Sequence, residues 1–143
     1  MPGEDKGIRA RAHVDGALLD SFVASLREKM AIASMVVFGS RATGEDLEES
    51  DYDILVLSPD FKACPPHDRV VRLLETWPGS VALEPVAMTP EEFREAEGAL
   101  VWDMLADGLV IEDDGTFEAK RRLFRGRLER GELVRGDGYW SFS

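Results

Sequence analysis

Two short polar segments of this chain adjoin hydrophobic runs that are typical of buried strands. Gly39 and Ser40 follow one such run, and Asp51 and Asp53 stand at the start of the next. Glycine lets a ligand approach the backbone amides closely, and a helix start after such a turn directs N–H groups at an anion. Two carboxylates two residues apart on a strand share a face and repel each other unless a cation lies between them. Together these residues predict a site for a polyphosphate held through a hard ion such as Mg²⁺.

The residues resemble the signature of the nucleotidyltransferases of the DNA polymerase beta superfamily, specifically the minimal nucleotidyltransferase (MNT-like) domains. That signature is a Gly-Ser-Arg turn, a short loop and a Ser-Asp-x-Asp strand start, which here are residues 39–41 and 50–53. The family carries a third carboxylate, usually Asp, ahead of a Thr-Pro-Glu-Glu-Phe helix start. Glu84 occupies that slot, ahead of residues 89–93. The resemblance covers about residues 18–112 and implies a polymerase-beta-like α/β fold, a small mixed sheet flanked by helices.

The resemblance also implies roles for the motif residues. Gly39 and Ser40 would hold the β- and γ-phosphates of a nucleoside triphosphate. Asp51, Asp53 and Glu84 would be the catalytic carboxylates and the metal ligands. Two Mg²⁺ ions are expected, with Mn²⁺ as the alternative.

Two residues of the motif have two interpretations each. Arg41 either neutralises phosphate charge or pairs with Asp46 or Glu48. Glu84 either completes the metal site or is a solvated residue, in which case the third ligand is missing. Pro85 follows it directly, so this strand should be at the edge of the sheet or carry a bulge.

The function implied by the resemblance is transfer of AMP from ATP to a hydroxyl acceptor on a partner protein of the HEPN type, as in toxin-antitoxin pairs. One alternative is an antitoxin-like binding module, catalytically weak, that masks its partner. Another is an antibiotic nucleotidyltransferase, although those enzymes usually carry a larger second domain for the small-molecule acceptor.

The composition predicts a single domain over residues 1–143, with a basic helix and an aromatic tail in residues 116–143 after the motif core. No apolar run is long enough to span a membrane, and the N-terminus lacks a signal-peptide pattern, which favours a cytoplasmic protein. Cys64 is the only cysteine, so an internal disulfide is excluded.

The formal net charge of −11 argues against a general nucleic-acid binder. The charge is uneven, because residues 120–135 hold seven basic and two acidic side chains, a local charge of +5 that leaves −16 on the rest. This basic segment either binds phosphates or an acidic partner, or folds back on its own domain. The aromatic residues of the tail predict docking on the core or on another subunit, the latter giving a homo-oligomer: Tyr139, Trp140 and Phe142.

Periodicity and capping signals place the elements. Helices are expected over about 15–30, 68–76, 89–106 and 116–130, and strands over 33–38, 53–57, 81–88 and 109–111. Asp15 is a predicted N-cap, and Thr89 with Glu92 forms a predicted capping box.

Overall fold

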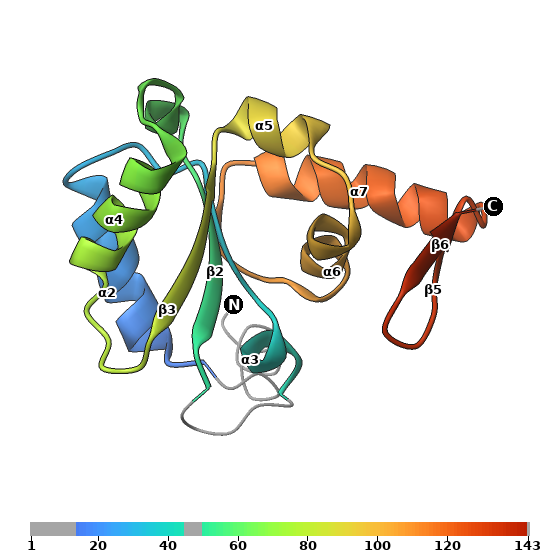
Figure 1. Cartoon of the computed structure of the whole chain (residues 1–143), viewed down its shortest axis with the longest axis horizontal. Coiled ribbons are helices and arrows are strands. Elements are labelled where there is room, and N and C mark those ends of the chain that lie inside the picture. Colours follow the sequence, from blue (N-terminus) through green and yellow to red (C-terminus); the bar gives the residue numbers. More distant parts are fainter. Residues whose placement is uncertain (1–13, 45–49, 143) are drawn as a thin grey trace.

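A four-stranded mixed sheet lies between two groups of helices in the computed structural model, which describes residues 14–44 and 50–142 (Figure 1). The strand order is β3-β2-β1-β4; β1 runs antiparallel to β2 and β4, whereas β2 and β3 are parallel. No helix in these ranges has the length and apolar character needed to cross a lipid bilayer. The elements in chain order are α2 (Gly16–Arg27), β1 (Ser34–Phe38), α3 (Ser40–Thr43), β2 (Tyr52–Leu57), the 3-10 helix η1 (Pro59–Ala63), α4 (Pro66–Thr76), β3 (Leu83–Met88), α5 (Pro90–Glu95), α6 (Ala99–Asp107), β4 (Leu109–Asp113), α7 (Thr116–Glu129), β5 (Leu133–Arg135) and β6 (Trp140–Phe142).

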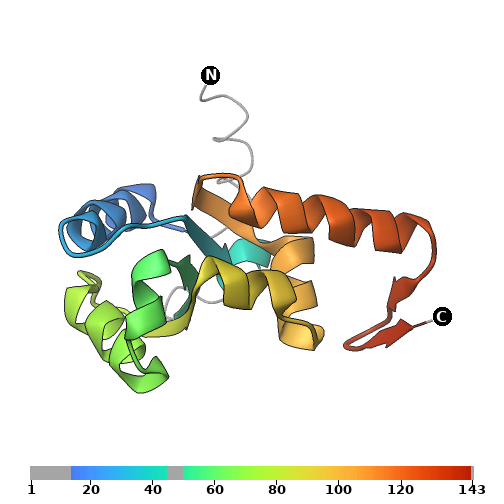
Figure 2. The same cartoon turned by 90° about the horizontal axis from the view of Figure 1, so that it is seen from above.

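Alternate residues of the central strands face opposite helix layers, as the two-residue period of a strand requires. Val37 and Ile54 pack in the core under α2 and α4, whereas Val36 and Leu55 pack in the core under α5, α6 and α7. Seen from above, the two helix groups lie on opposite sides of the sheet (Figure 2). The central strands are therefore buried on both faces, which fixes their register and the place of any side chain at their ends.

The predicted helix starts are confirmed. The Asp15 side chain accepts a hydrogen bond from the Leu18 amide at the start of α2. At the start of α5, the Thr89 hydroxyl accepts from the Glu92 amide at 3.0 Å, and the Glu92 carboxylate accepts from the Thr89 amide at 2.8 Å. Because Arg69 of α4 also donates to Glu92 at 2.6 Å, the pKa of that carboxyl is below its ordinary range.

The single helix predicted over residues 89–106 is wrong, because the chain breaks it into α5 and α6. Gly98 adopts a φ of +117°, a conformation that L side chains rarely adopt. Lys120 of α7 donates from Nζ to the carbonyls at the end of α5: Phe93 at 2.5 Å, Arg94 at 3.0 Å and Ala96 at 2.6 Å. A cation from a distant helix thus satisfies carbonyls that a continuous helix would have used internally.

Replacing Lys120 with methionine should lower the free energy of unfolding by about 2 kcal/mol, because three carbonyls, two of them in partly buried hydrogen bonds, lose a charged donor. Urea unfolding of Lys120→Met beside Arg122→Met tests this, since Arg122 is exposed on the same helix and its loss should cost about 0.5 kcal/mol or less. Equal losses in the two variants would show that the α5 end does not depend on Lys120.

Residues of the aromatic tail form a hairpin of β5 and β6, which sequence analysis did not predict, and of its aromatic side chains Trp140 packs on the core whereas Tyr139 and Phe142 stay exposed. The Trp140 ring lies 6.0 Å from that of Trp102 and 5.7 Å from that of Phe124, and its Nε1 donates to Asp103 at 2.9 Å. Arg135 donates to Asp107 at 2.6 Å. The hairpin is therefore fastened to α6 and α7 at the end of α7 remote from the sheet (Figures 1 and 2).

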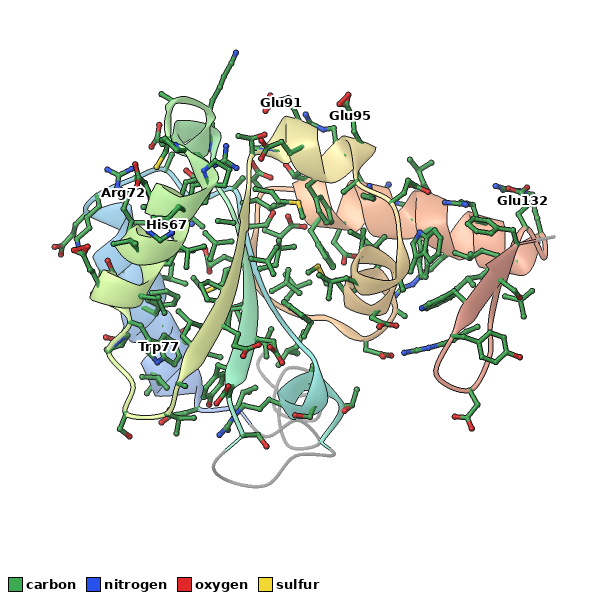
Figure 3. All side chains as sticks on the ribbon, in the orientation of Figure 1. His67, Arg72, Trp77, Glu91, Glu95 and Glu132 are labelled. Carbon is green, nitrogen blue, oxygen red and sulfur yellow. The ribbon has the colours of Figure 1, made fainter. Side chains whose placement is uncertain are left out.

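Several cations of the basic segment bind groups of their own domain. Arg121 donates to the carbonyls of Leu105 at 3.0 Å and Gly108 at 2.6 Å. Arg127 pairs with Glu97 at 3.1 Å, and Arg130 pairs with Glu132, which is labelled in Figure 3. These contacts favour the interpretation that the segment folds back on the domain.

Candidate functional site

Three strand ends bring the candidate residues to one end of the sheet. β1 ends at Phe38 just before Gly39, whereas β2 and β3 begin close to Asp53 and Glu84. Phe38 is the register partner of Asp53 in the antiparallel pair, and Asp53 is the partner of Glu84 in the parallel pair. The end of the sheet beside α3 in Figure 1 therefore carries the turn and the acidic residues side by side.

The backbone of Gly39 lies in close contact with the Asp53 carboxylate. It has a φ of +73° and precedes α3, which is a single turn. A Cβ atom built on Gly39 would lie 2.3 Å from Oδ2 of Asp53. Only glycine fits here, because both the backbone conformation and the carboxylate exclude a side chain.

Asp53 is half-buried and interacts with the other two candidate carboxylates. Burial, the charges of Glu84 and Asp51 and a side-chain hydrogen bond with Glu84 together raise the pKa of Asp53 to about 6. Negative charge at this point is thus disfavoured in the metal-free protein. A divalent cation beside it would relieve both the burial cost and the repulsion.

The donor set fits a hard ion, but the residues the structure describes do not form a ready metal-binding cluster of three acidic, histidine or cysteine side chains. Asp53 and Glu84 are brought together, with the Glu84 side chain exposed, and Asp51, which is also exposed, precedes β2 and acts on Asp53 through its charge. Carboxylate oxygens are the ligands that Mg²⁺ prefers, and Mg²⁺ usually takes only one or two from protein, with water and substrate phosphates completing its shell. The pair of Asp53 and Glu84 satisfies that requirement.

Arg41 is buried, with only 6% of its surface exposed. Its Nε donates to the Ser50 carbonyl at 2.7 Å, and its guanidinium lies 4.1 Å from the centre of the Tyr52 ring. These contacts join the turn to the acidic segment. The predicted alternatives for pairing, Asp46 and Glu48, lie outside the described residues.

Ser40 is the first residue of α3 and is half-buried. Its carbonyl accepts from the Gly44 amide at 2.9 Å and from the Thr43 hydroxyl at 3.2 Å. The phosphate-binding role predicted for Gly39 and Ser40 would therefore use the turn and the start of a one-turn helix, in which few peptide dipoles are aligned.

Sequence analysis missed two aromatic residues beside the site. Tyr52 is buried between the two aspartates, and the Trp77 ring lies 5.3 Å from it. Trp77 directly follows α4, on the α2 side of the sheet (Figure 3). The alternation of residues 51–53 could have indicated that Tyr52 points into the core, but nothing local in the sequence links Trp77 to it.

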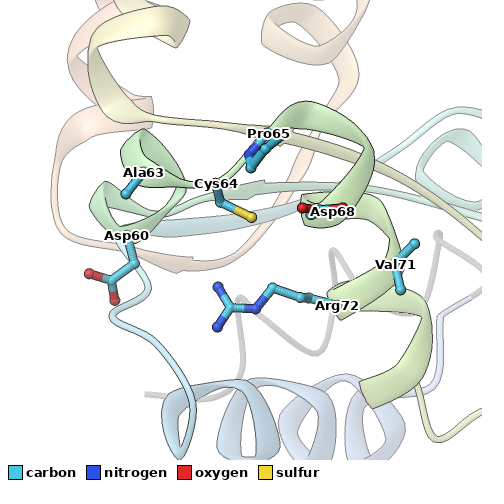
Figure 4. A pocket seen from close by; sticks show the side chains of 7 residues that line it. All are labelled: Asp60, Ala63, Cys64, Pro65, Asp68, Val71 and Arg72. Atoms are coloured by element: carbon cyan, nitrogen blue, oxygen red, sulfur yellow. The ribbon is translucent and has the colours of Figure 1, made fainter.

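A pocket of about 450 Å³ lies between η1 and α4, and it contains none of the predicted site residues (Figure 4). It is lined by Asp60, Ala63, Cys64, Pro65, Asp68, Val71 and Arg72. Cys64 is half-buried and its sulfur points into this pocket. η1 follows the end of β2, whereas the candidate residues lie at its start, so the pocket is not an extension of the candidate site.

One family model matches most of the chain. It is described as a nucleotidyltransferase domain and matches residues 19–124. No curated protein sequence matches the chain at a significant level.

Solved structures share the fold at low sequence identity. A candidate nucleotidyltransferase from Sulfolobus solfataricus is 19% identical, over 76% of this chain and 86% of that one, with a TM-score of 0.53. A toxin-antitoxin complex with AMP-PNP matches with a TM-score of 0.55 and 18% identity, over 78% of this chain and 86% of that one. An MntA toxin-antitoxin complex carrying two Asp-to-Glu substitutions matches with a TM-score of 0.57 and 15% identity, over 82% and 88%.

Proposed function

Since the chain belongs to the nucleotidyltransferase domain family, we propose that it transfers AMP from ATP to a hydroxyl group of a partner protein. The observation that carries this proposal is the in-register pair of Asp53 and Glu84 against the Gly39 turn. The raised pKa of Asp53 supports the proposal. A carboxyl group that is hard to ionise by itself ionises more readily when a cation lies beside it. The fold shared with a toxin-antitoxin complex that contains AMP-PNP supports ATP as the donor.

Each residue has a role in this reaction. The turn at Gly39 and Ser40 binds the phosphates through backbone amides and a hydroxyl. Asp53 and Glu84, with Asp51 beside them, would hold Mg²⁺, with two ions expected and Mn²⁺ as the alternative. When bound, the metal supplies positive charge that neutralises the triphosphate and the leaving pyrophosphate.

The transfer itself breaks one bond and forms one. The acceptor oxygen attacks the α-phosphorus, the bond from that phosphorus to the bridging oxygen breaks, and pyrophosphate leaves. Glu84 accepts the proton of the attacking hydroxyl. Arg41 contacts the backbone of the acidic segment, so its role is to hold that segment in place. The acceptor implied by the resemblance to MNT-like domains is a hydroxyl of a HEPN-type partner.

The test uses purified protein, Mg²⁺ and a lysate of the host, with ATP labelled on the α-phosphate in one series and on the γ-phosphate in another. The wild type should transfer the α-label to a discrete protein band, and Asp53→Asn should not. Transfer of the γ-label would indicate a kinase reaction instead. ATP binding without transfer of either label would favour an antitoxin-like binding module.

A further inference from the structure

Arg41 connects the Gly39 turn with the acidic segment that begins β2. It lies in α3, directly after the Gly39 turn, and its Nε donates to Ser50, directly before Asp51. Its guanidinium lies on the ring of Tyr52 at 4.1 Å from the ring centre. A buried, planar guanidinium in this double contact restrains both segments more than a single hydrogen bond could.

Tyr52 extends this contact toward β3 and α2. Its ring lies 5.3 Å from that of Trp77 at an interplanar angle of 58°, and its hydroxyl accepts from the Asp15 amide at 2.9 Å. In the sheet Tyr52 pairs with Leu83, one step before the pair of Asp53 and Glu84. The position of the tyrosine ring is therefore tied to the start of both parallel strands.

Trp77 completes the set by fixing the turn that leads into β3. Its Nε1 donates to the Val81 carbonyl at 2.8 Å, and its ring meets Phe22 of α2 edge-on at 5.0 Å. The turn lies close against the indole, because a Cβ atom on Gly79 would be 2.9 Å from the ring. Trp77 thus reaches a residue three positions before Glu84.

We propose that Arg41, Tyr52 and Trp77 form a positioning stack that sets the relative places of the Gly39 turn, the Asp51–Asp53 segment and the start of β3. The stack lies on the α2 side of the sheet, where Tyr52 packs in the core with Phe22. Asp53 is the next residue of β2, so its side chain points to the opposite face of the sheet from Tyr52. The stack therefore supports the carboxylates without competing for their ligand. The consequence of this positioning for metal binding and catalysis rests on the proposed function. Small displacements of metal ligands strongly lower the metal affinity and the reaction rate.

Arg69 provides a matched control for Arg41. It is also 6% exposed, its Nε donates to the Cys64 carbonyl at 2.8 Å, and its guanidinium lies 5.6 Å from the Phe61 ring centre. Arg69 lies next to η1, away from the site. Lysine at either position keeps the charge but loses the planar fork.

The experiment compares Arg41→Lys with Arg69→Lys by amide hydrogen exchange over residues 39–43, 50–53 and 81–84, and by Mn²⁺ affinity from electron paramagnetic resonance. Arg41→Lys should speed exchange in all three segments about tenfold and weaken Mn²⁺ binding about tenfold. Arg69→Lys should leave both within about twofold of wild type, even where its melting temperature falls equally.

Faster exchange confined to residues 39–43, or an equal effect of Arg69→Lys, would overturn the proposal. Gly79→Ala is a second variant that displaces Trp77 without touching Arg41, and it should speed exchange over residues 50–53 as well as 81–84. Exchange that changes only beside residue 79 would remove Trp77 from the stack. A wild type that binds no Mn²⁺ would contradict the proposed function, whereas the exchange results would still decide whether the stack exists.

Discussion

Replacing Asp53 with asparagine is expected to stabilise the metal-free protein at neutral pH while lowering nucleotide transfer by about a thousandfold or more. The gain in stability should be about 1–2 kcal/mol, because asparagine removes a charge that is disfavoured by burial and by Glu84. We expect less than the full linkage value, since the carboxylate is partly in contact with water. Urea unfolding and the α-label assay together measure the two effects.

The control for this prediction is Glu75→Gln, which changes net charge equally at an exposed position on α4. Its stability should stay within about 0.5 kcal/mol of wild type, and its transfer rate should not change. Mg²⁺ should raise the melting temperature of the wild type and of Glu75→Gln but not of Asp53→Asn. An Asp53→Asn protein less stable than wild type at pH 7 would contradict the account of the site.

The stability advantage of Asp53→Asn should also depend on pH. The pKa of Asp53 is about 6 in the folded protein against an ordinary 3.8, so the folded state binds its proton more tightly than the unfolded state does. Lowering the pH from 6 toward 3.8 therefore stabilises the wild type through this group, and above pH 6 that contribution is lost. The difference in unfolding free energy between the two proteins should be largest near pH 7 and should vanish near pH 4.

Gly39→Ala should disable the site by a steric route and cost about 3 kcal/mol of stability. The added Cβ atom would lie 2.3 Å from Oδ2 of Asp53, and the alanine backbone would have to keep a φ of +73°. Displacing that carboxylate by about 1 Å should lower nucleotide transfer about a hundredfold. Unfolding free energies and α-label transfer rates check both parts.

Gly131→Ala separates the two causes. Gly131 has a φ of +72°, and a Cβ atom there would meet nothing within 4 Å. Its substitution should cost only about 1–2 kcal/mol of backbone strain and leave transfer unchanged. If Gly39→Ala loses no more stability than Gly131→Ala, the turn does not press against Asp53 as the structure shows.

Local signals in the sequence predicted the elements whose causes are local. Asp15 and Thr89 begin helices because their own side chains satisfy nearby amides, and this can be recognised from a few residues. Pro85 correctly predicted an edge strand, since β3 is the outermost strand of the sheet. The break between α5 and α6 was missed because Lys120, from a helix that follows later, binds the carbonyls at that point.

The candidate site, too, was predicted only where its causes are local in the sequence. The spacing of Asp51 and Asp53 and the Gly39 turn were predicted from the chain itself. The pairing of Asp53 with Glu84 depends on the register of two parallel strands separated by α4, and no short-range pattern specifies that register. The position of Trp77 beside the site was not predicted, because its contacts with Tyr52 and Phe22 come from distant segments.

Pro85 has a consequence for how the sheet meets other chains. The carbonyl of Ala82 accepts from the Tyr52 amide of β2, and that of Met88 accepts from the Ser58 amide directly after β2. Even-numbered residues of β3 therefore turn their backbone toward β2, and Pro85 turns its nitrogen outward. The outer edge of β3 therefore lacks a hydrogen-bond donor directly after Glu84. A foreign strand cannot complete a regular ladder there, which protects the sheet from edge-to-edge aggregation. It also leaves the flank of the carboxylate pair, where Glu84 is exposed, free of an added strand.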